Sequence, residues 1–481
     1  MSQVEVDKII PQSGTTLTVG DSGDTVTLTS GANLSVDGTI KLDGNYPTGT
    51  NNVALGDQAL SSGSLSGGNN TAVGSLSLLS NTSGASNTAV GRCALNASSL
   101  ASNNTAIGDR SLLVTTCGDN TSIGASSVRC NTTGENLVAL GVNALFSNTT
   151  SDNNTAVGKE SLCANTTGSN NTAVGRSALA ANTTGSKVTA IGVSALTNNT
   201  TADNNIAIGC GALLTNTTGA ENNALGNASL CSNTTGTNNT SLGHLALRAN
   251  TTASNNTAVG VSALTANTTG ADNVAVGQNA LSVNTDTGLN TAIGTNAMCS
   301  HSTNGVDNTA VGHGALKGST EGYYNTAVGK NALSNVTTGD NNLGFGRDSG
   351  VDAVFNLTTQ SNNIVIGNNS HQSAYIKIDW TVTSDLRDKT EVKDVTHGLD
   401  FVNQITPIEY RFKKSREDDT PTGLTKYGFS AQEILELEGE NPVIINNQDA
   451  DNLKLTSAYL VPVLVNAIKE LKARIEVLEN E

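Results

Sequence analysis

The 481-residue sequence predicts a mainly β chain, a parallel β-roll or β-solenoid of 17-residue coils that ends in a small α+β domain with a coiled-coil helix. Three observations lead to this prediction. A glycine recurs at every seventeenth position through most of the chain, only 3% of the residues are aromatic, and residues 384–481 differ sharply in composition from the rest. One Trp, six Phe and seven Tyr are too few to fill several conventional enzyme cores.

Charge and cysteine content narrow the class of protein further. A formal net charge of −16 argues against a nucleic-acid binder, which needs a basic surface. The sequence has no apolar run of the roughly 18 residues that a membrane span needs, and it does not open with a basic segment followed by an apolar one, so we expect neither a membrane span nor a secretory signal. Seven cysteines without a CxxC pair indicate free thiols in a reducing cytoplasm and no zinc site or disulfide framework.

The repeat is defined by the glycine that ends each NTAVG-like segment. Eighteen such glycines give seventeen intervals, and fourteen of these intervals have the same length of seventeen positions. The glycines are at positions 56, 74, 91, 108, 124, 141, 158, 175, 192, 209, 226, 243, 260, 277, 294, 312, 329 and 346. Such self-similarity is the signature of a repeat architecture.

The columns of the repeat predict its local structure. The residue before each glycine is apolar in all 18 rows, and the fourth residue after it is Leu in 15 rows. We therefore expect two short strands per coil, each contributing one aliphatic side chain to an interior stack, with Asn-Thr-Thr-Gly as the turn. Asn lies four residues before the glycine in 16 rows, and Asn131 through Asn284 occupy the seventh position after it in ten consecutive rows. Stacked coils turn these columns into asparagine ladders. A disordered Asn/Thr/Gly-rich tract would not keep the apolar columns in register.

One coil buries little apolar surface, so a single thin solenoid is expected to associate around its long axis. The repeats resemble the NxxAIGxxAxA coils of trimeric autotransporter adhesin heads, which form left-handed β-rolls packed as trimers. This resemblance covers about 300 residues and implies a homotrimer over residues 51–350. The coils here are longer, and the secretion signal and membrane anchor expected of such adhesins are not seen, which disfavours a surface adhesin.

The two segments that flank the repeats are predicted to have separate roles. Residues 1–50 alternate apolar and polar residues between Gly and Asp turns, as in TTLTVG and TIKLDG, which predicts a β segment. This opening resembles the N-terminal stretches of tailed-phage fibre proteins, which implies that it joins the virion. Residues 351–383 are expected to form the distal shaft, the tip and a linker.

Residues 384–481 are predicted to form an independent α+β domain. They hold 12 of the 25 Lys and Arg residues, 19 of the 41 acidic residues and four of the six Pro residues. Apolar residues near the end follow the 3,4,3,4,3 spacing of a short coiled-coil seam. The seam consists of Val461, Leu464, Ile468, Leu471, Ile475 and Leu478.

Several motifs in this domain occur in the order found in one known family. They are Ser384 to Lys389 (SDLRDK), Gly398 to Asp400 (GLD), Gly428 to Glu433 (GFSAQE), Tyr459 to Pro462 (YLVP) and Ala467 to Leu471 (AIKEL). Together they resemble the endosialidase-type intramolecular chaperone at the C-termini of phage tail spikes and fibres. The resemblance implies a domain that trimerises, templates the folding of the β-structured fibre and cuts itself off with a Ser-Lys dyad. The cut would fall between Thr383 and Ser384.

The chemistry of that cut makes Ser384 the candidate nucleophile and Lys389 the candidate base. A serine hydroxyl attacks well only when a base removes its proton, and a lysine amine is a base only when neutral, a form that burial favours. A structural alternative is that Ser384 caps a helix with Asp385 in the first turn. Asp385 and Arg387 are expected to be structural, as are four residues of the GFSAQE motif, Gly428, Phe429, Gln432 and Glu433. No oxyanion hole can be identified from the sequence.

We therefore expect a trimeric tail fibre or spike precursor, assembled in the host cytoplasm and located in the virion. Its expected partners are a tail or baseplate protein at the N-terminus and a host surface receptor, either a glycan or an outer-membrane component. Three alternatives remain: a non-cleaving trimeric adhesin whose C-terminal domain stays as the tip, an ice-binding solenoid, and a polysaccharide-degrading spike. No cofactor or metal site is expected, since the five His form no metal-binding motif.

Overall fold

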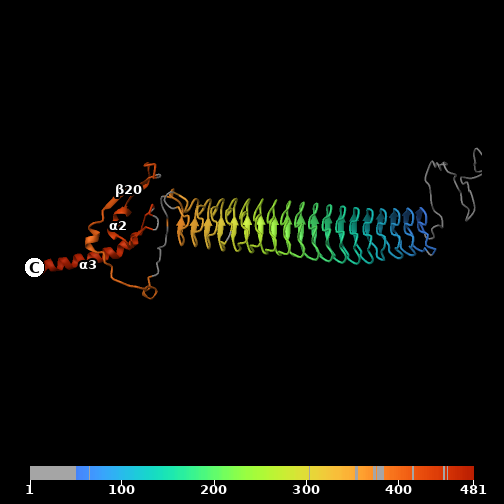
Figure 1. Cartoon of the computed structure of the whole chain (residues 1–481), viewed down its shortest axis with the longest axis horizontal. Helices are drawn as coiled ribbons and strands as arrows, with labels where there is room; N and C mark the ends of the chain where they lie inside the picture. The colour runs from blue at the N-terminus through green and yellow to red at the C-terminus, as the bar shows by residue number, and fades with distance from the viewer. Residues whose placement is uncertain are drawn as a thin grey trace, which may run out of the picture.

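A computed structural model describes residues 50–63, 65–302, 304–352, 356–371, 375, 384–413, 416–447, 450–451 and 453–480. The N-terminal segment proposed to join the virion therefore lies outside the described residues, except at its last position. The described part consists of a long rod of stacked coils and a C-terminal unit beyond the end of the rod that carries β19 (Figure 1).

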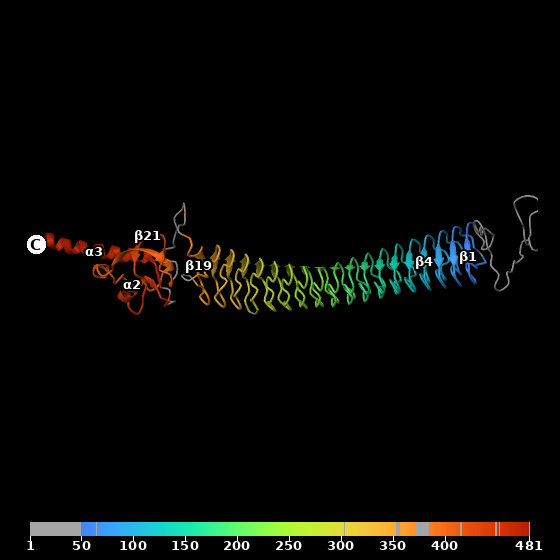
Figure 2. The ribbon, with the colours of Figure 1, turned by 90° about the horizontal axis from the view of Figure 1, so that it is seen from above.

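The rod is a parallel β-solenoid with one three-residue strand in each coil. The strands are β1 Val53–Leu55, β2 Thr71–Val73, β3 Thr88–Val90, β4 Thr105–Ile107, β5 Thr121–Ile123, β6 Val138–Leu140, β7 Thr155–Val157, β8 Thr172–Val174, β9 Thr189–Ile191, β10 Ile206–Ile208, β11 Asn223–Leu225, β12 Thr240–Leu242, β13 Thr257–Val259, β14 Val274–Val276, β15 Thr291–Ile293, β16 Thr309–Val311, β17 Thr326–Val328, β18 Leu343–Phe345 and β19 Ile364–Ile366. Each strand pairs in parallel with the next, usually with the residue seventeen positions further along the chain, as in Thr155↔Thr172. At the spacing of neighbouring strands the rod is roughly 85 Å long, and it bows gently along its length (Figure 2).

The predicted β-solenoid is confirmed, but the prediction of two strands per coil is wrong. The segment that carries the second aliphatic column is a turn, in which the leucines have a left-handed backbone, for example Leu179 with φ +54°. Three further positions per coil also have positive φ, such as Gly175, Ser177 and Lys187. A coil of 17 residues closes on itself only if the chain turns sharply at these positive-φ residues. The segment expected to be a second strand is therefore a turn.

The prediction of the interior stack is half right. Leu179 and the other leucines of its column are buried, but the other buried columns consist of small residues, one at the centre of each strand, such as Ala173, and one just before each leucine, such as Ala178. Because side chains alternate across a strand, the residue before each glycine points outward together with the first residue of the strand. Ile191, for example, is 38% exposed. The rod therefore presents a continuous apolar column to its surroundings, which a short repeat motif alone does not reveal.

Asparagine ladders fill the remaining interior, as predicted. In one ladder each side-chain amide donates to the preceding side-chain oxygen, with Asn182 Nδ2 2.8 Å from Asn165 Oδ1. In the other, Asn154 Oδ1 accepts the backbone N–H of Asn171 at 2.9 Å. These bonds satisfy amides that would otherwise be buried without partners.

The C-terminal unit is small and mixed. Its helices are α1 Leu399–Val402, α2 Ala431–Glu438 and α3 Leu460–Glu479, its 3-10 helices are η1 Leu386–Asp388 and η2 Ser457–Tyr459, and its strands are β20 Pro407–Lys413, β21 Pro421–Phe429, β22 Ile445–Asn446 and β23 Lys454–Leu455. Strands β20 and β21 form an antiparallel pair. The core contains Phe401, Ile434, Ile444, Ile445, Leu460 and Val463.

Candidate functional site

The candidate nucleophile and base lie next to each other at the start of the C-terminal unit. Lys389 Nζ donates to Ser384 Oγ at 2.9 Å and to the Ser384 carbonyl oxygen at 3.2 Å. The short helix η1 between them folds the chain back, so that a separation of five positions brings the two side chains into contact. The geometry is that of a serine held against its potential base.

The alternative in which Ser384 caps a helix is not observed. Asp385 is the N-cap of η1, and its carboxylate accepts the backbone N–H of Arg387 at 2.9 Å. The Arg387 guanidinium also donates to that carboxylate, and these bonds lower the pKa of Asp385 below its usual value. Asp385 and Arg387 therefore stabilise the turn at η1. The Ser384 hydroxyl takes no part in this cap and instead accepts a hydrogen bond from Lys389 Nζ.

The dyad is open to water in a single chain. Ser384 and Lys389 are both exposed, as are the residues between them. Thr383, whose carbonyl would be attacked, lies outside the described residues, so the path of attack on that carbonyl is not described. A complete reaction centre needs groups that shield Lys389 and polarise that carbonyl.

The GFSAQE motif forms a structural junction. Helix α2 begins after Ser430, whose hydroxyl accepts the backbone N–H of Glu433 at 3.3 Å. The Glu433 carboxylate accepts a bond from Thr406 Oγ1 at 2.7 Å. A Cβ atom on Gly428 would lie 2.9 Å from the Tyr410 ring, and Phe429 packs on the core. Gln432 lies in the first turn of α2, within 3.4 Å of the Ser430 hydroxyl. Among the described residues no hydrogen bond joins this motif to the dyad.

A clamp between α3 and the residues at the start of α1 was not anticipated from the sequence. The Glu470 carboxylate accepts the backbone N–H of Leu399 at 2.8 Å, and Asn466 Nδ2 donates to the His397 carbonyl at 3.0 Å. A Cβ atom on Gly398 would displace the Glu470 carboxylate, so a side chain at this position would disturb the bond to Leu399. The motifs that contain Gly398 and Glu470 were visible in the sequence, but their contact joins distant segments of the chain and no local pattern predicts it.

Helix α3 has two apolar faces. Leu460, Val463 and Ala467 are buried against the domain, while the predicted seam faces outward. In that seam Val461 is 57% exposed and Ile468 is 65% exposed. The helix thus anchors the unit on one side and leaves a heptad stripe without a partner in the single chain.

Within the described residues no group of three or more His, Cys, Asp or Glu side chains is arranged to hold a metal ion. The described helices include none with the length and apolar character to cross a bilayer. All seven cysteines are free thiols.

Residues 384–441 match the protein family described as Chaperone of endosialidase. The matched stretch begins at Ser384 and includes the dyad and the GFSAQE motif. It is a short part of the chain and ends before α3. Neither the curated proteins nor the solved structures gave a match.

Proposed function

We propose that this chain is the precursor of a trimeric phage tail fibre or spike, in which residues 384–481 chaperone the folding of the solenoid and then cleave themselves off between Thr383 and Ser384. The observation that carries the proposal is the 2.9 Å contact between Lys389 Nζ and Ser384 Oγ at the first residue of the family match. The family match adds the expectation of a chaperone domain and a trimer.

The proposed cleavage is a single turnover within each chain. Ser384 Oγ bonds to the Thr383 carbonyl carbon while its proton passes to the neutral amine of Lys389. The peptide bond between Thr383 and Ser384 then breaks, and the departing Ser384 amine takes a proton. Water hydrolyses the resulting ester, which restores the hydroxyl and leaves Thr383 with a free carboxylate.

Assembly is the proposed trigger for this reaction. Both dyad side chains are exposed in the single chain, and exclusion of water favours the neutral form in which a lysine amine acts as a base. The clamp formed by Glu470 and Asn466 links helix α3 to residues 395–399, a few positions after Lys389. Packing of three α3 helices along their exposed seams would bring neighbouring chains close to the dyad.

Two unpartnered apolar surfaces support the trimer. One is the outward column of the solenoid, where Ile107, Leu140 and Leu225 are between 37% and 43% exposed. This column has one apolar side chain per coil, so the surface that covers it best has the same spacing along the axis. A second copy of this chain has that spacing. The other is the α3 seam, whose 3.5-residue average spacing is that of coiled coils.

A chaperone is needed because of the repeat itself. Nearly identical coils allow two chains to pair one repeat out of register at little cost in free energy. A trimer of the C-terminal units aligns the ends of the three chains before their coils pack against one another. Cleavage after folding then makes the assembly effectively irreversible.

The mature shaft is proposed to be part of the virion, joined through its N-terminus to a tail or baseplate protein and turned toward a host receptor. A second candidate function is a trimeric adhesin that never cleaves and keeps residues 384–481 as its tip. The exposure of both dyad side chains favours this candidate if assembly does not shield them.

Intact mass spectrometry of the purified full-length protein tests the cleavage. We expect the wild type to yield a fragment that ends at Thr383, and Ser384→Ala and Lys389→Ala to remain full length. Lys389→Arg keeps the positive charge but supplies no neutral amine, so it should also remain intact. Ser430→Ala removes a helix cap in the same unit and should still cleave. A wild-type trimer that stays uncleaved would overturn the self-cleavage proposal. The non-cleaving trimeric adhesin would then be the remaining candidate function.

A further inference from the structure

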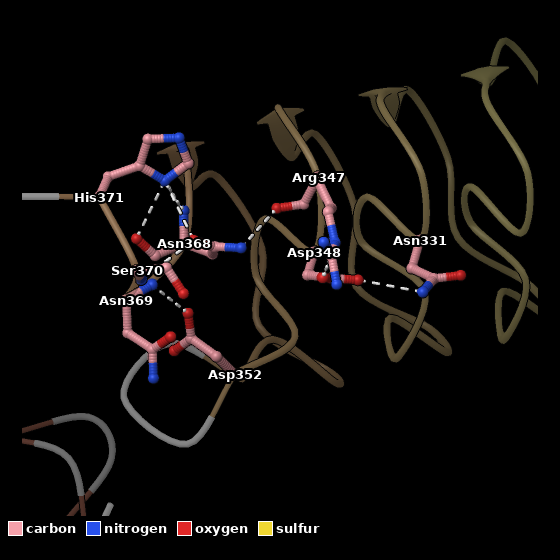
Figure 3. A network of polar contacts seen from close by, with 8 residues as sticks. All are labelled: Asn331, Arg347, Asp348, Asp352, Asn368, Asn369, Ser370 and His371. Carbon is pink, nitrogen blue, oxygen red and sulfur yellow. Dashed lines mark hydrogen bonds and ion pairs between the residues drawn. The ribbon is translucent and has the colours of Figure 1, made fainter. Parts of the chain in front are cut away.

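The end of the solenoid nearest the C-terminal unit carries a half-open hollow of about 540 Å³. Its volume lies within the range of small-molecule sites, roughly 300–1,000 Å³. Asp348, Val351, Asp352 and Asn368 are half-buried in it, and Arg347, Asn369, Ser370 and His371 are exposed. Figure 3 shows the polar contacts that join these residues to the last coils.

The aliphatic core ends where the hollow begins. The buried leucine column runs to Leu333, after which its next two positions are Gly350 and the exposed His371. Leu357 is buried beside Gly350 and replaces the missing side chain of the column. The coil between β18 and β19 is longer than the others, with Leu343 paired to Ile364, so the chain departs from its repeat at this place.

Hydrogen bonds hold the lining in place. Asn331 Nδ2 donates to Asp348 Oδ1 at 3.0 Å, and the backbone N–H of Asn369 donates to Asp352 Oδ2 at 2.7 Å. Asn368 Nδ2 donates to the Arg347 carbonyl at 3.0 Å. The lining is therefore preorganised by contacts between coils, and binding would not have to order it first.

Several polar groups on the rim have no partner among the described residues. They are the two terminal nitrogens of Arg347, the side-chain amide of Asn369, the hydroxyl of Ser370 and Nε2 of His371. Donors and acceptors of this kind, close together on a polar surface, suit the vicinal hydroxyls of a sugar ring, each of which both donates and accepts. Two carboxylates against one guanidinium make the hollow unfavourable for an anionic ligand.

We propose that this hollow binds a neutral saccharide. The inference rests on the proposed function, because it assigns the receptor contact of the fibre to the last coils of the shaft and the chemical class of the receptor to an uncharged glycan. Val351 supplies the small apolar surface on which one face of a sugar ring can lie.

Saturation-transfer NMR and calorimetry on the full-length protein test the proposal. The probes are methyl α-glucoside, methyl β-galactoside, N-acetylglucosamine and, as the anionic comparison, N-acetylneuraminic acid. The variant is Arg347→Ala combined with Asn369→Ala, since both side chains are exposed and the ion pair of Arg347 Nε with Asp348 Oδ2, at 2.8 Å, lies within the lining itself. Lys330→Ala is the matched control, because Lys330 occupies the position of Arg347 one coil earlier.

We expect saturation transfer from the protein to at least one neutral probe. The double variant should bind that probe about tenfold more weakly, and Lys330→Ala should bind it with the affinity of the wild type. The absence of transfer to every neutral probe, an equal affinity in the double variant, or binding of the anionic probe alone would overturn the inference. If the protein forms trimers and cleaves itself but binds no saccharide, the proposed saccharide site is refuted and the proposed function is not. Saccharide binding by a protein that neither cleaves nor trimerises would refute the proposed function instead.

Discussion

A Cβ atom on Gly209 would lie 2.6 Å from the carbonyl carbon of Gly226 in the next coil. The backbone at Gly209 has φ +137°, a conformation that L side chains rarely adopt. Both facts recur at the equivalent glycine of nearly every coil, such as Gly158 against Gly175. The glycine period is thus required by stacking, because the coils approach each other backbone to backbone at this corner.

The first prediction uses two glycines of one coil. Gly209→Ala introduces both a collision and backbone strain, and should lower the free energy of unfolding by more than about 3 kcal/mol. Gly211 has φ +65° and open space around the position of a Cβ atom. Gly211→Ala should therefore cost only about 1 kcal/mol. Urea denaturation followed by circular dichroism compares the two. Equal losses would contradict the stacking argument.

The second prediction concerns the outward apolar column. Ile191→Glu places a carboxylate at a position that is 38% exposed in the single chain but buried in the proposed trimer. Burial of an unpaired charge costs several kcal/mol, so we expect the trimer to dissociate or fail to form. Size-exclusion chromatography with light scattering measures the assembly.

The control for that prediction lies in the same coil. Thr201 is exposed in the bend between β9 and β10, outside the strands, and Thr201→Glu should leave the trimer intact. Dissociation by both variants would indicate a general effect of added charge. A wild-type chain that is monomeric would show that another partner, or none, covers the column.

The third prediction concerns His301, which occupies the position one coil after Asn284, the last residue of one asparagine ladder. This histidine is buried, with Nε2 2.8 Å from the Gly305 carbonyl and Nδ1 3.3 Å from Ser319 Oγ. Burial lowers the pKa of His301 below its ordinary value of 6.5, and the bond to Gly305 offsets this only in part. The unfolded chain therefore binds the proton at a higher pH than the folded chain does.

The stability contributed by neutral His301 is complete above its ordinary pKa of 6.5 and falls as the pH drops below that value toward the folded pKa. His301→Asn restores the residue type of Asn284 one coil earlier and removes this titration. The urea midpoint should accordingly fall more between pH 7.5 and pH 5 for the wild type than for His301→Asn. An equal fall in both would assign the pH dependence to the carboxylates.

Some of the candidate site was predictable and some was not. Ser384 and Lys389 were selected by their motif, and a turn between them was sufficient to bring them together. The choice of Asp385 over Ser384 as the cap was not predictable, because either side chain can accept a backbone N–H at a helix start. The clamp between Leu399 and Glu470 and the hollow beside Asp352 depend on contacts between distant segments.

By itself the sequence determined the coil length, the glycine period, the leucine column and the asparagine ladders. Each of these repeats along the chain, and stacking converts a periodic position into a column whatever the path of a single coil. Only the tertiary structure decided which face each column occupies: the small Ala173 points inward, and the larger Val174 beside it in the strand points outward. The reason is that the corners set by positive-φ residues such as Ser177 and Leu179 turn each coil too tightly for two large aliphatic columns to share its interior with two asparagine ladders.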